Sequence, residues 1–263
     1  MFLDEIVGAR KKRLESLKKQ KSTSEIEKQA LEALERNTLP SFKDSIKGEG
    51  LSLVGEVKKA SPSRGVIREN FNYLEISRIY EDCVEGISVL TEQDYFLGEP
   101  QYLEEIATAL PHIPLLRKDF IIDPYQLYES RVLGSSAVLL IAAVLSGETL
   151  SYFCRLCREL GLETLVEIHG EEELEKALDA GPDIVGINNR NLEDFSVSAQ
   201  TTLQLAPLVP AGFPVISESG FMQPRDVQKI AGCRVEAILV GEALMRAYNP
   251  RKLAEEFKNA QGN

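Results

Sequence analysis

The sequence predicts an α/β protein, a (β/α)8 TIM barrel with an N-terminal helical extension. Eight short apolar segments follow residue 50, and each is followed by a longer segment with helical spacing. Eight strand–helix units favour a closed parallel barrel over a doubly wound open sheet, which normally has fewer strands and a glycine-rich first turn. The predicted strands span residues 51–57, 87–90, 113–117, 137–141, 164–168, 183–187, 213–217 and 236–240.

The chain divides into an extension and a barrel. Residues 1–48 have a mostly helical pattern and precede the first strand, so we expect them to form an N-terminal helical extension packed on the barrel. We expect residues 49–263 to form the barrel, because no Pro-, Gly- or Ser-rich linker interrupts them. Asp123-Pro124 and Asn249-Pro250 are typical of helix starts, with an N-cap followed by proline.

Composition excludes several classes of partner. The 263 residues carry 30 Lys and Arg against 41 Asp and Glu, a net charge of −11, which disfavours nucleic acid as a partner. The only basic cluster, residues 10–13, lies in a helical pattern and is expected to be a solvated helix face. The longest apolar run, residues 137–145, is too short to cross a membrane, and no signal peptide is visible. We expect a cytoplasmic protein without membrane contact.

Cysteine and histidine usage indicates no metal site. Four cysteines in a chain of this length are not a disulfide framework. Cys154 and Cys157 have the CxxC spacing but lie within one helical pattern, and the chain has only two histidines, His112 and His169. Neither a dinucleotide-binding GxGxxG nor a P-loop is present. We therefore expect no metal and no cofactor.

Polar side chains gather where the predicted strands end. Alternation along the first strand places Glu56 and Lys58 on one face, and such a pair is costly to bury unless it is used. A structural ion pair is the alternative. In a barrel the carboxyl ends of the strands form one rim, where chemistry collects. We expect His169 beside the reacting groups rather than among them. The other polar strand ends are Arg117-Lys118-Asp119, Glu167, Asn188-Asn189-Arg190, Ser217-Glu218-Ser219-Gly220 and Gly241-Glu242.

The last two strand ends indicate a phosphate ligand. Ser219-Gly220 and Gly241-Glu242 each lead into a helix-forming segment, and these loops commonly bind phosphate in such barrels through backbone N–H groups. Lys58, Lys118 and Arg190 add local positive charge to an acidic chain. We expect a phosphorylated small-molecule substrate.

Motifs at these strand ends resemble one known family. They are "EVKKASPSRG", "ISVLTEQDYFLG", "LLRKDFIIDPYQ", "LLIAAVL", "LVEIHGEEELEKAL", "GINNRNL", "SESG" and "LVGEALMR", in this order along essentially the whole chain. The chain resembles indole-3-glycerol-phosphate synthase. The resemblance implies a carbon–carbon lyase that converts 1-(2-carboxyphenylamino)-1-deoxyribulose 5-phosphate to indole-3-glycerol phosphate in tryptophan biosynthesis, with loss of carbon dioxide and water.

The resemblance also implies roles for individual residues. Lys118 is the general acid for ring closure, and a pKa lowered by burial or by neighbouring cations would suit that role. Glu167 takes an acid/base role, and Lys58 acts with it, oriented by Glu56. The remaining implied contacts to substrate are Asn188 and Ser219 for hydroxyls and carboxylate, Ser61, Gly220, Gly241 and Glu242 for phosphate, Arg190 between those ends, and Phe96, Phe120, Leu139 and Leu192 for the anthranilate ring.

Two other functions remain possible from the sequence. Phosphoribosylanthranilate isomerase is another phosphosugar barrel, but it uses a Cys and Asp pair, and no cysteine lies at the end of the first predicted strand. A phosphate-binding barrel without activity would require the loss of Lys58, Lys118 or Glu167, and all three are present. We expect a monomer rather than a homo-oligomer.

Overall fold

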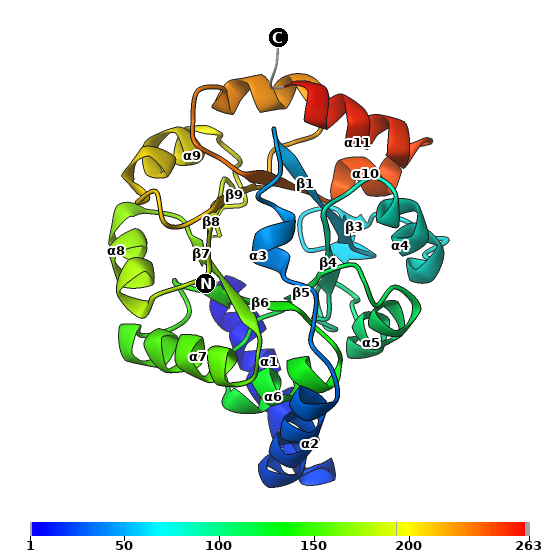
Figure 1. Ribbon diagram of the computed structural model, residues 1–263, viewed down its shortest axis with the longest axis vertical. Helices are drawn as coiled ribbons and strands as arrows, with labels where there is room; N and C mark the ends of the chain where they lie inside the picture. Colours follow the sequence, from blue (N-terminus) through cyan, green and yellow to red (C-terminus); the bar gives the residue numbers. More distant parts are fainter. Residues whose placement is uncertain (1, 193, 261–263) are drawn as a thin grey trace.

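The chain forms a closed barrel of eight parallel strands (Figure 1). A computed structural model describes residues 2–192 and 194–260. Neighbouring strands hydrogen-bond in the cyclic order β1-β4-β5-β6-β7-β8-β9-β10, which confirms the predicted barrel and excludes the open sheet. The strands are β1 (Ser52–Val57), β4 (Gly86–Leu90), β5 (Leu115–Lys118), β6 (Ala137–Ile141), β7 (Glu163–Ile168), β8 (Ile184–Asn188), β9 (Val215–Glu218) and β10 (Ala237–Val240).

All eight predicted strands are present, and the segment 137–141 agrees with β6 at both ends. A short antiparallel hairpin after β1, made of β2 (Ala60–Ser61) and β3 (Gly65–Val66), was not predicted. The hairpin lies in the loop that follows the first strand, where two-residue strands leave no periodic pattern in the sequence.

Helices surround the strands and follow each of them (Figure 1). Both predicted caps are confirmed: Asp123 accepts a hydrogen bond from the backbone N–H of Tyr125 (3.0 Å), and Asn249 accepts one from that of Lys252 (3.1 Å). The helices are α4 (Tyr73–Glu81), α5 (Pro100–Ala109), α6 (Pro124–Val132), α7 (Gly147–Glu159), α8 (Glu171–Ala180), α9 (Gln200–Leu205), α10 (Glu242–Arg246) and α11 (Pro250–Asn259), with 3₁₀ turns η1 (Ala206–Leu208) and η2 (Pro224–Ile230). No helix in the described ranges combines the length and the apolar character needed to cross a bilayer.

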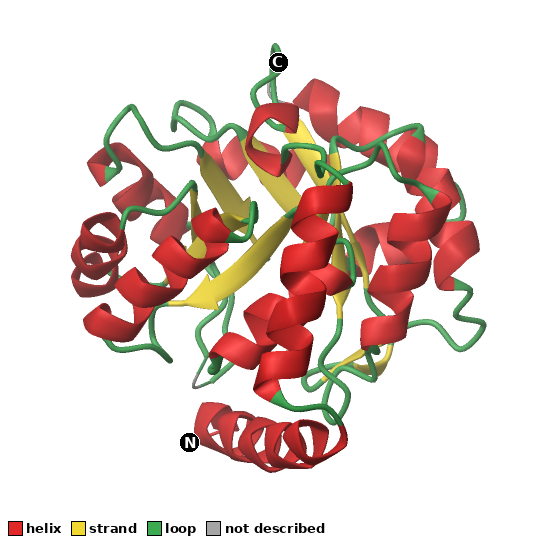
Figure 2. Cartoon of the chain, turned by 60° about the horizontal axis from the view of Figure 1, so that its bottom comes forward, coloured by secondary structure: helices red, strands yellow, loops and turns green. Residues whose placement is uncertain are grey.

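Three helices precede the barrel: α1 (Phe2–Gln20), α2 (Thr23–Arg36) and α3 (Phe42–Ser45). Figure 2 shows the first helix lying outside the ring that surrounds the strands. Helix α2 packs against α6, and Ser22 with Glu25 forms its capping box. The expectation of a wholly solvated basic cluster on α1 is wrong at Arg10, which is 1% exposed and pairs with Asp119 at 2.6 Å.

The interior of the barrel explains how the strands position a site. Apolar residues from seven strands form one cluster inside the barrel, together with Phe42 and Ile46 from the segment before β1. The cluster includes Val54, Leu116, Leu139, Leu165, Ile184, Ile216 and Leu239. Because side chains alternate, the residue two positions later also points inward, one layer nearer the carboxyl ends. This next layer contains Glu56, Lys118, Glu167 and Glu218. The outward faces of the strands pack on the helices in a separate apolar layer.

Candidate active site

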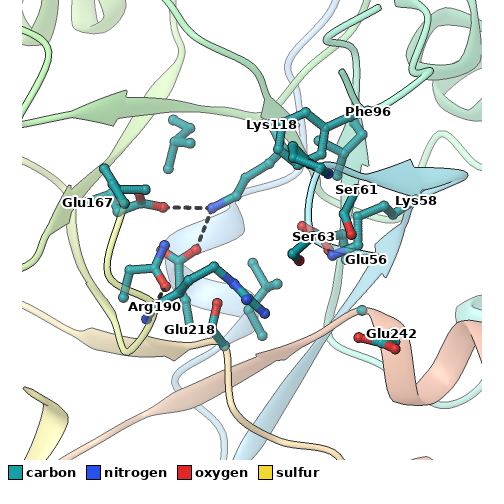
Figure 3. A pocket seen from close by; sticks show the side chains of 18 of the residues that line it. Glu56, Lys58, Ser61, Ser63, Phe96, Lys118, Glu167, Arg190, Glu218 and Glu242 are labelled. Carbon is teal, nitrogen blue, oxygen red and sulfur yellow. Dashed lines mark hydrogen bonds and ion pairs between the residues drawn. The ribbon is translucent and has the colours of Figure 1, made fainter. Parts of the chain in front are cut away.

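A pocket opens at the carboxyl ends of the strands (Figure 3). Its wall includes the whole set of fifteen residues that the sequence singled out, and they come from every strand of the barrel or the loop that follows it. They are Glu56, Lys58, Ser61, Phe96, Lys118, Phe120, Leu139, Glu167, Asn188, Arg190, Leu192, Ser219, Gly220, Gly241 and Glu242.

Lys118 reaches across the pocket to two carboxylates (Figure 3). Its Nζ lies 2.9 Å from Oε2 of Glu167 on β7 and also contacts Oε2 of Glu218 on β9. Glu167 and Glu218 are buried, with 3% and 1% of their side chains exposed, and Lys118 is mostly buried, with 14% exposed. Low exposure strengthens such charge-assisted contacts, because little water competes for them.

The carboxylates set the protonation of this group. Burial opposes a charge on Lys118, but Glu167 and Glu218 outweigh burial and raise its pKa. The pKa that the sequence argument expected to be lowered is therefore raised in the structure. Burial also opposes the charge on Glu167, yet the nearby Lys118 and His169 lower the pKa of Glu167. Burial raises the pKa of Glu218 to about 7, helped by the charges of Glu167 and Glu56, although Lys118 acts against this rise.

Lys58 forms a second ion pair on the other side of the pocket (Figure 3). Its Nζ contacts Oε2 of Glu56, as the alternation along the first strand predicted. The backbone of Gly241 fits closely against this pair, and a Cβ atom there would overlap the carboxylate of Glu56. A side chain at this position would therefore displace the carboxylate of Glu56 and disturb the pair.

The loops after β9 and β10 form one end of the pocket. Ser219 and Gly220 have φ angles of 66° and 93°, so this turn takes the left-handed conformation. The carboxylate of Glu242 turns toward Arg64, at 3.4 Å, and Arg246, at 3.1 Å. Glu242 is the first residue of α10 and lines the pocket.

An apolar wall lines the other end. The rings of Phe96 and Phe120 lie 6.3 Å apart, tilted by 41°. Leu139 from β6 and Leu192 from the loop after β8 complete this wall, and Leu3 of helix α1 also lines the pocket. A flat apolar ring could bind here while charged groups face it from the centre of the pocket.

Sequence reasoning assigned no role to Glu218, and it expected burial or cations, rather than carboxylates, to set the pKa of Lys118. Alternation was the signal for Glu218, because Ile216 points into the barrel and the residue two positions on must do the same. Gly186 on β8 makes room for that carboxylate, since a Cβ atom there would overlap it. By the same rule Arg117 points outward, where its guanidinium contacts Glu129 at 2.6 Å.

No metal-binding group appears among the residues described. Within 2–192 and 194–260, no cluster of three His, Cys, Asp or Glu side chains could hold a metal ion. The four cysteines, at 83, 154, 157 and 233, are unpaired thiols.

Comparisons with known proteins agree with this geometry. The family model described as indole-3-glycerol phosphate synthase matches residues 3–257. The chain belongs to the indole-3-glycerol phosphate synthase family. The synthase named in Thermoanaerobacter pseudethanolicus is 43% identical over 264 residues, covering 100% of this chain and 99% of the relative. The one named in Endomicrobium trichonymphae is 46% identical over 260 residues, covering 98% of this chain and 100% of the relative.

Solved structures support the fold. The 3-hexulose-6-phosphate synthase of Salmonella typhimurium superposes with a TM-score of 0.66 at 15% identity, over 80% of this chain and 98% of the other. The protein KGPDC of Streptococcus mutans gives a TM-score of 0.63 at 15% identity, over 81% and 97%. At this identity the likeness shows the barrel alone. Members of the indole-3-glycerol phosphate synthase family are decarboxylating lyases of tryptophan biosynthesis.

Proposed function

We propose that the chain catalyses the family's reaction through the charged cluster at the centre of the pocket. The substrate is 1-(2-carboxyphenylamino)-1-deoxyribulose 5-phosphate, and the product is indole-3-glycerol phosphate, formed with loss of carbon dioxide and water. The observation that carries this proposal is the position of Lys118 between Glu167 and Glu218, inside a pocket with an apolar wall and a glycine-lined opposite end.

Ring closure requires a proton donor at the ribulose carbonyl. The ring carbon that bears the carboxylate attacks this carbonyl, and negative charge develops on its oxygen. Lys118 is the buried ammonium best placed to donate that proton, because its Nζ extends into the pocket from the inward face of β5. Loss of carbon dioxide then restores the conjugation of the ring.

Dehydration requires a second acid and a base. A hydroxyl must leave as water, and a ring proton must be removed. Lys58, held by Glu56, is the candidate acid for the leaving hydroxyl, and Glu167, whose lowered pKa keeps it ionised, is the candidate base. Asn188 and Ser219 line the pocket beside these groups and would position substrate hydroxyls and carboxylate.

The two ends of the pocket would hold the two ends of the substrate. Backbone N–H groups at Gly220, Gly241 and Glu242, with the hydroxyl of Ser61, would bind the phosphate. Arg190, whose pKa burial lowers, would lie between the phosphate and the carboxylate. The aromatic ring would enter the apolar wall. Holding both ends folds the substrate so that its reacting carbons meet, an orientation effect of several kcal/mol.

Production of the indole ring provides a direct assay. The chain contains no tryptophan, so fluorescence of the product would rise over a background without protein indole. Turnover without added metal or cofactor is expected. Binding of inorganic phosphate without any turnover would instead favour a barrel that has lost its activity.

Lys118→Ala tests the assigned acid. We expect kcat to fall by about 10²–10⁴-fold, the usual contribution of a positioned acid, while the affinity for inorganic phosphate changes little. Lys47→Ala is the matched control, since Lys47 pairs with Asp44 next to the short helix α3, away from the pocket. Undiminished turnover of Lys118→Ala would remove the assignment.

Three further features of the chain are proposed on narrower grounds. Cytoplasmic action is supported by four cysteines that are all unpaired thiols. A division into an extension, 1–48, and a catalytic barrel, 49–263, is supported by the three helices that precede β1. A monomer suffices for the chemistry, because the pocket wall is complete within one chain.

A further inference from the structure

His169 lies between two carboxylates just outside the pocket. It follows β7 directly, and its side chain is 15% exposed. Its Nδ1 is 3.2 Å from Oε2 of Glu173 on α8, and the same oxygen accepts the backbone N–H of His169 at 2.8 Å. Its Nε2 is 3.6 Å from Oε1 of Glu167 and is buried without a hydrogen-bond partner among the described residues.

The contact with Glu173 decides which nitrogen titrates. An ionised carboxylate only accepts hydrogen bonds, so Nδ1 of His169 carries a proton in both charge states of the ring. Nε2 is then the nitrogen that gains or loses a proton, and it faces Glu167. A neutral Nε2 would direct its lone pair at an ionised carboxylate, which is unfavourable. In the favourable arrangements Nε2 and the Glu167 carboxylate together hold one proton, which is bound either to Nε2 or to Glu167.

Charges on three elements act on this proton. The groups that face His169 are Glu167 on β7, Glu173 on α8 and Glu218 on β9. Burial opposes a charge on the ring, but these carboxylates outweigh it and raise the pKa of His169. The effect is reciprocal, because the charged ring helps Lys118 to lower the pKa of Glu167. These opposite shifts favour the arrangement with the proton on Nε2 and with Glu167 ionised.

We propose that His169 is a positioning residue for the reaction, whose Nε2 proton holds Glu167 as an oriented anion ready to accept the ring proton. His169 is absent from the pocket wall, so it acts through Glu167 and touches no substrate. Oε2 of Glu167 is held by Lys118, and Oε1 faces Nε2 of His169 at 3.6 Å, so the two groups lie against different oxygens of the base. This inference rests on the proposed function, in which Glu167 is the base.

Two substitutions test the roles of Nδ1 and Nε2 of His169 separately. The amide of His169→Asn can still donate to Glu173 but places nothing at Nε2, whereas the longer amide of His169→Gln can reach Glu167 without carrying a charge. For His169→Asn we expect the acid limb of the kcat–pH profile to move up by about one unit, with KM changed less than about threefold. His169→Gln should show a smaller shift and a higher kcat than His169→Asn.

His112→Gln is the matched control, because His112 is 62% exposed and pairs with Glu81 on the outside of the barrel. Its pH profile should equal that of the wild type. Superimposable profiles for His169→Asn and the wild type would overturn the role of His169 alone. Equal impairment of both His169 variants, with no shift of the limb, would indicate a packing role and overturn it as well. A wild-type chain that turns over no substrate would overturn the proposed function and this role together.

Nitrogen NMR of the imidazoles tests the coupling without turnover. The chain has two histidines, so the His112→Gln background leaves a single ring to observe. We expect His169 to titrate above the ordinary value of about 6.5 and to keep Nδ1 protonated when neutral. Adding Glu167→Gln should lower that pKa, since it removes the carboxylate that faces Nε2. A titration that does not respond to Glu167→Gln would refute the shared proton.

Discussion

Replacement of Arg10 by methionine tests how the first helix is held over the site. Arg10 on α1 donates from Nη2 to Oδ2 of Asp119 at 2.6 Å, and both side chains are almost fully buried. Removing one member of a buried ion pair costs about 3–5 kcal/mol when the other charge is left uncompensated. Methionine keeps most of the volume, so packing is largely preserved.

The expected cost is lower than that range for two reasons. Asp119 keeps three other donors: Arg117 at 3.2 Å, the hydroxyl of Thr91 at 2.6 Å and the backbone N–H of Phe120 at 2.8 Å. In addition, Nε and Nη1 of Arg10 are buried without a hydrogen-bond partner among the described residues, so the native pair already carries a desolvation cost. We expect Arg10→Met to lower the free energy of unfolding by about 2–3 kcal/mol.

Urea unfolding followed by circular dichroism measures this loss. At about 2–4 °C per kcal/mol for a chain of this size, the melting temperature should fall by roughly 4–12 °C. Arg13→Met is the control on the same helix, because Arg13 and Asp94 are 35% and 36% exposed and an exposed pair contributes about 0–1 kcal/mol. Equal stabilities of the two variants would refute the reasoning, as would a loss confined to Arg13→Met.

Two other predictions follow from the centre of the pocket. The folded pKa of Glu218, about 7, exceeds that of an unfolded glutamate, so its contribution to stability is complete below about pH 4 and is lost as the pH rises through 7. The free energy of unfolding of Glu218→Gln, relative to that of the wild type, should therefore rise between pH 4 and 7. Urea unfolding at several pH values measures it, and a difference that stays constant with pH would contradict the prediction. Gly241→Ala should displace the Glu56–Lys58 pair and lower kcat about a hundredfold. Gly212→Ala is the control, because Gly212 has open space around it and its replacement should leave kcat unchanged. Equal kcat values for the two variants would show that the close packing at Gly241 is unimportant.

The sequence predicted the barrel and the residues that line the pocket, because both depend on local patterns. Each strand is an apolar run that ends in polar residues, so the strand ends are visible in the sequence and the barrel gathers them at one rim. Alternation within one strand placed Glu56 and Lys58 together, and the structure agrees. These predictions needed no knowledge of which segments meet across the barrel.

The features that the sequence did not predict depend on distant segments. Arg10 looked like part of a solvated basic cluster, but its partner lies 109 positions further along the chain. The raised pKa of Lys118 arises from carboxylates on β7 and β9, which no local pattern connects to β5. The burial of residues at the ends of strands is also not visible in the sequence, and burial is what raises the pKa of Glu218.

The charges of the pocket act as one titrating unit. An ammonium held by two buried carboxylates gives up its proton reluctantly, so Lys118 with both Glu167 and Glu218 ionised is a weak acid. Protonation of Glu218, with its pKa near 7, removes one of those two charges and brings the pKa of Lys118 closer to the range useful for catalysis. Glu167 stays ionised, because the lysine and His169 both favour its charge. In the proposed mechanism the two carboxylates would therefore act differently: Glu167 would remain available as a base, while the protonation of Glu218 would adjust the acid strength of Lys118.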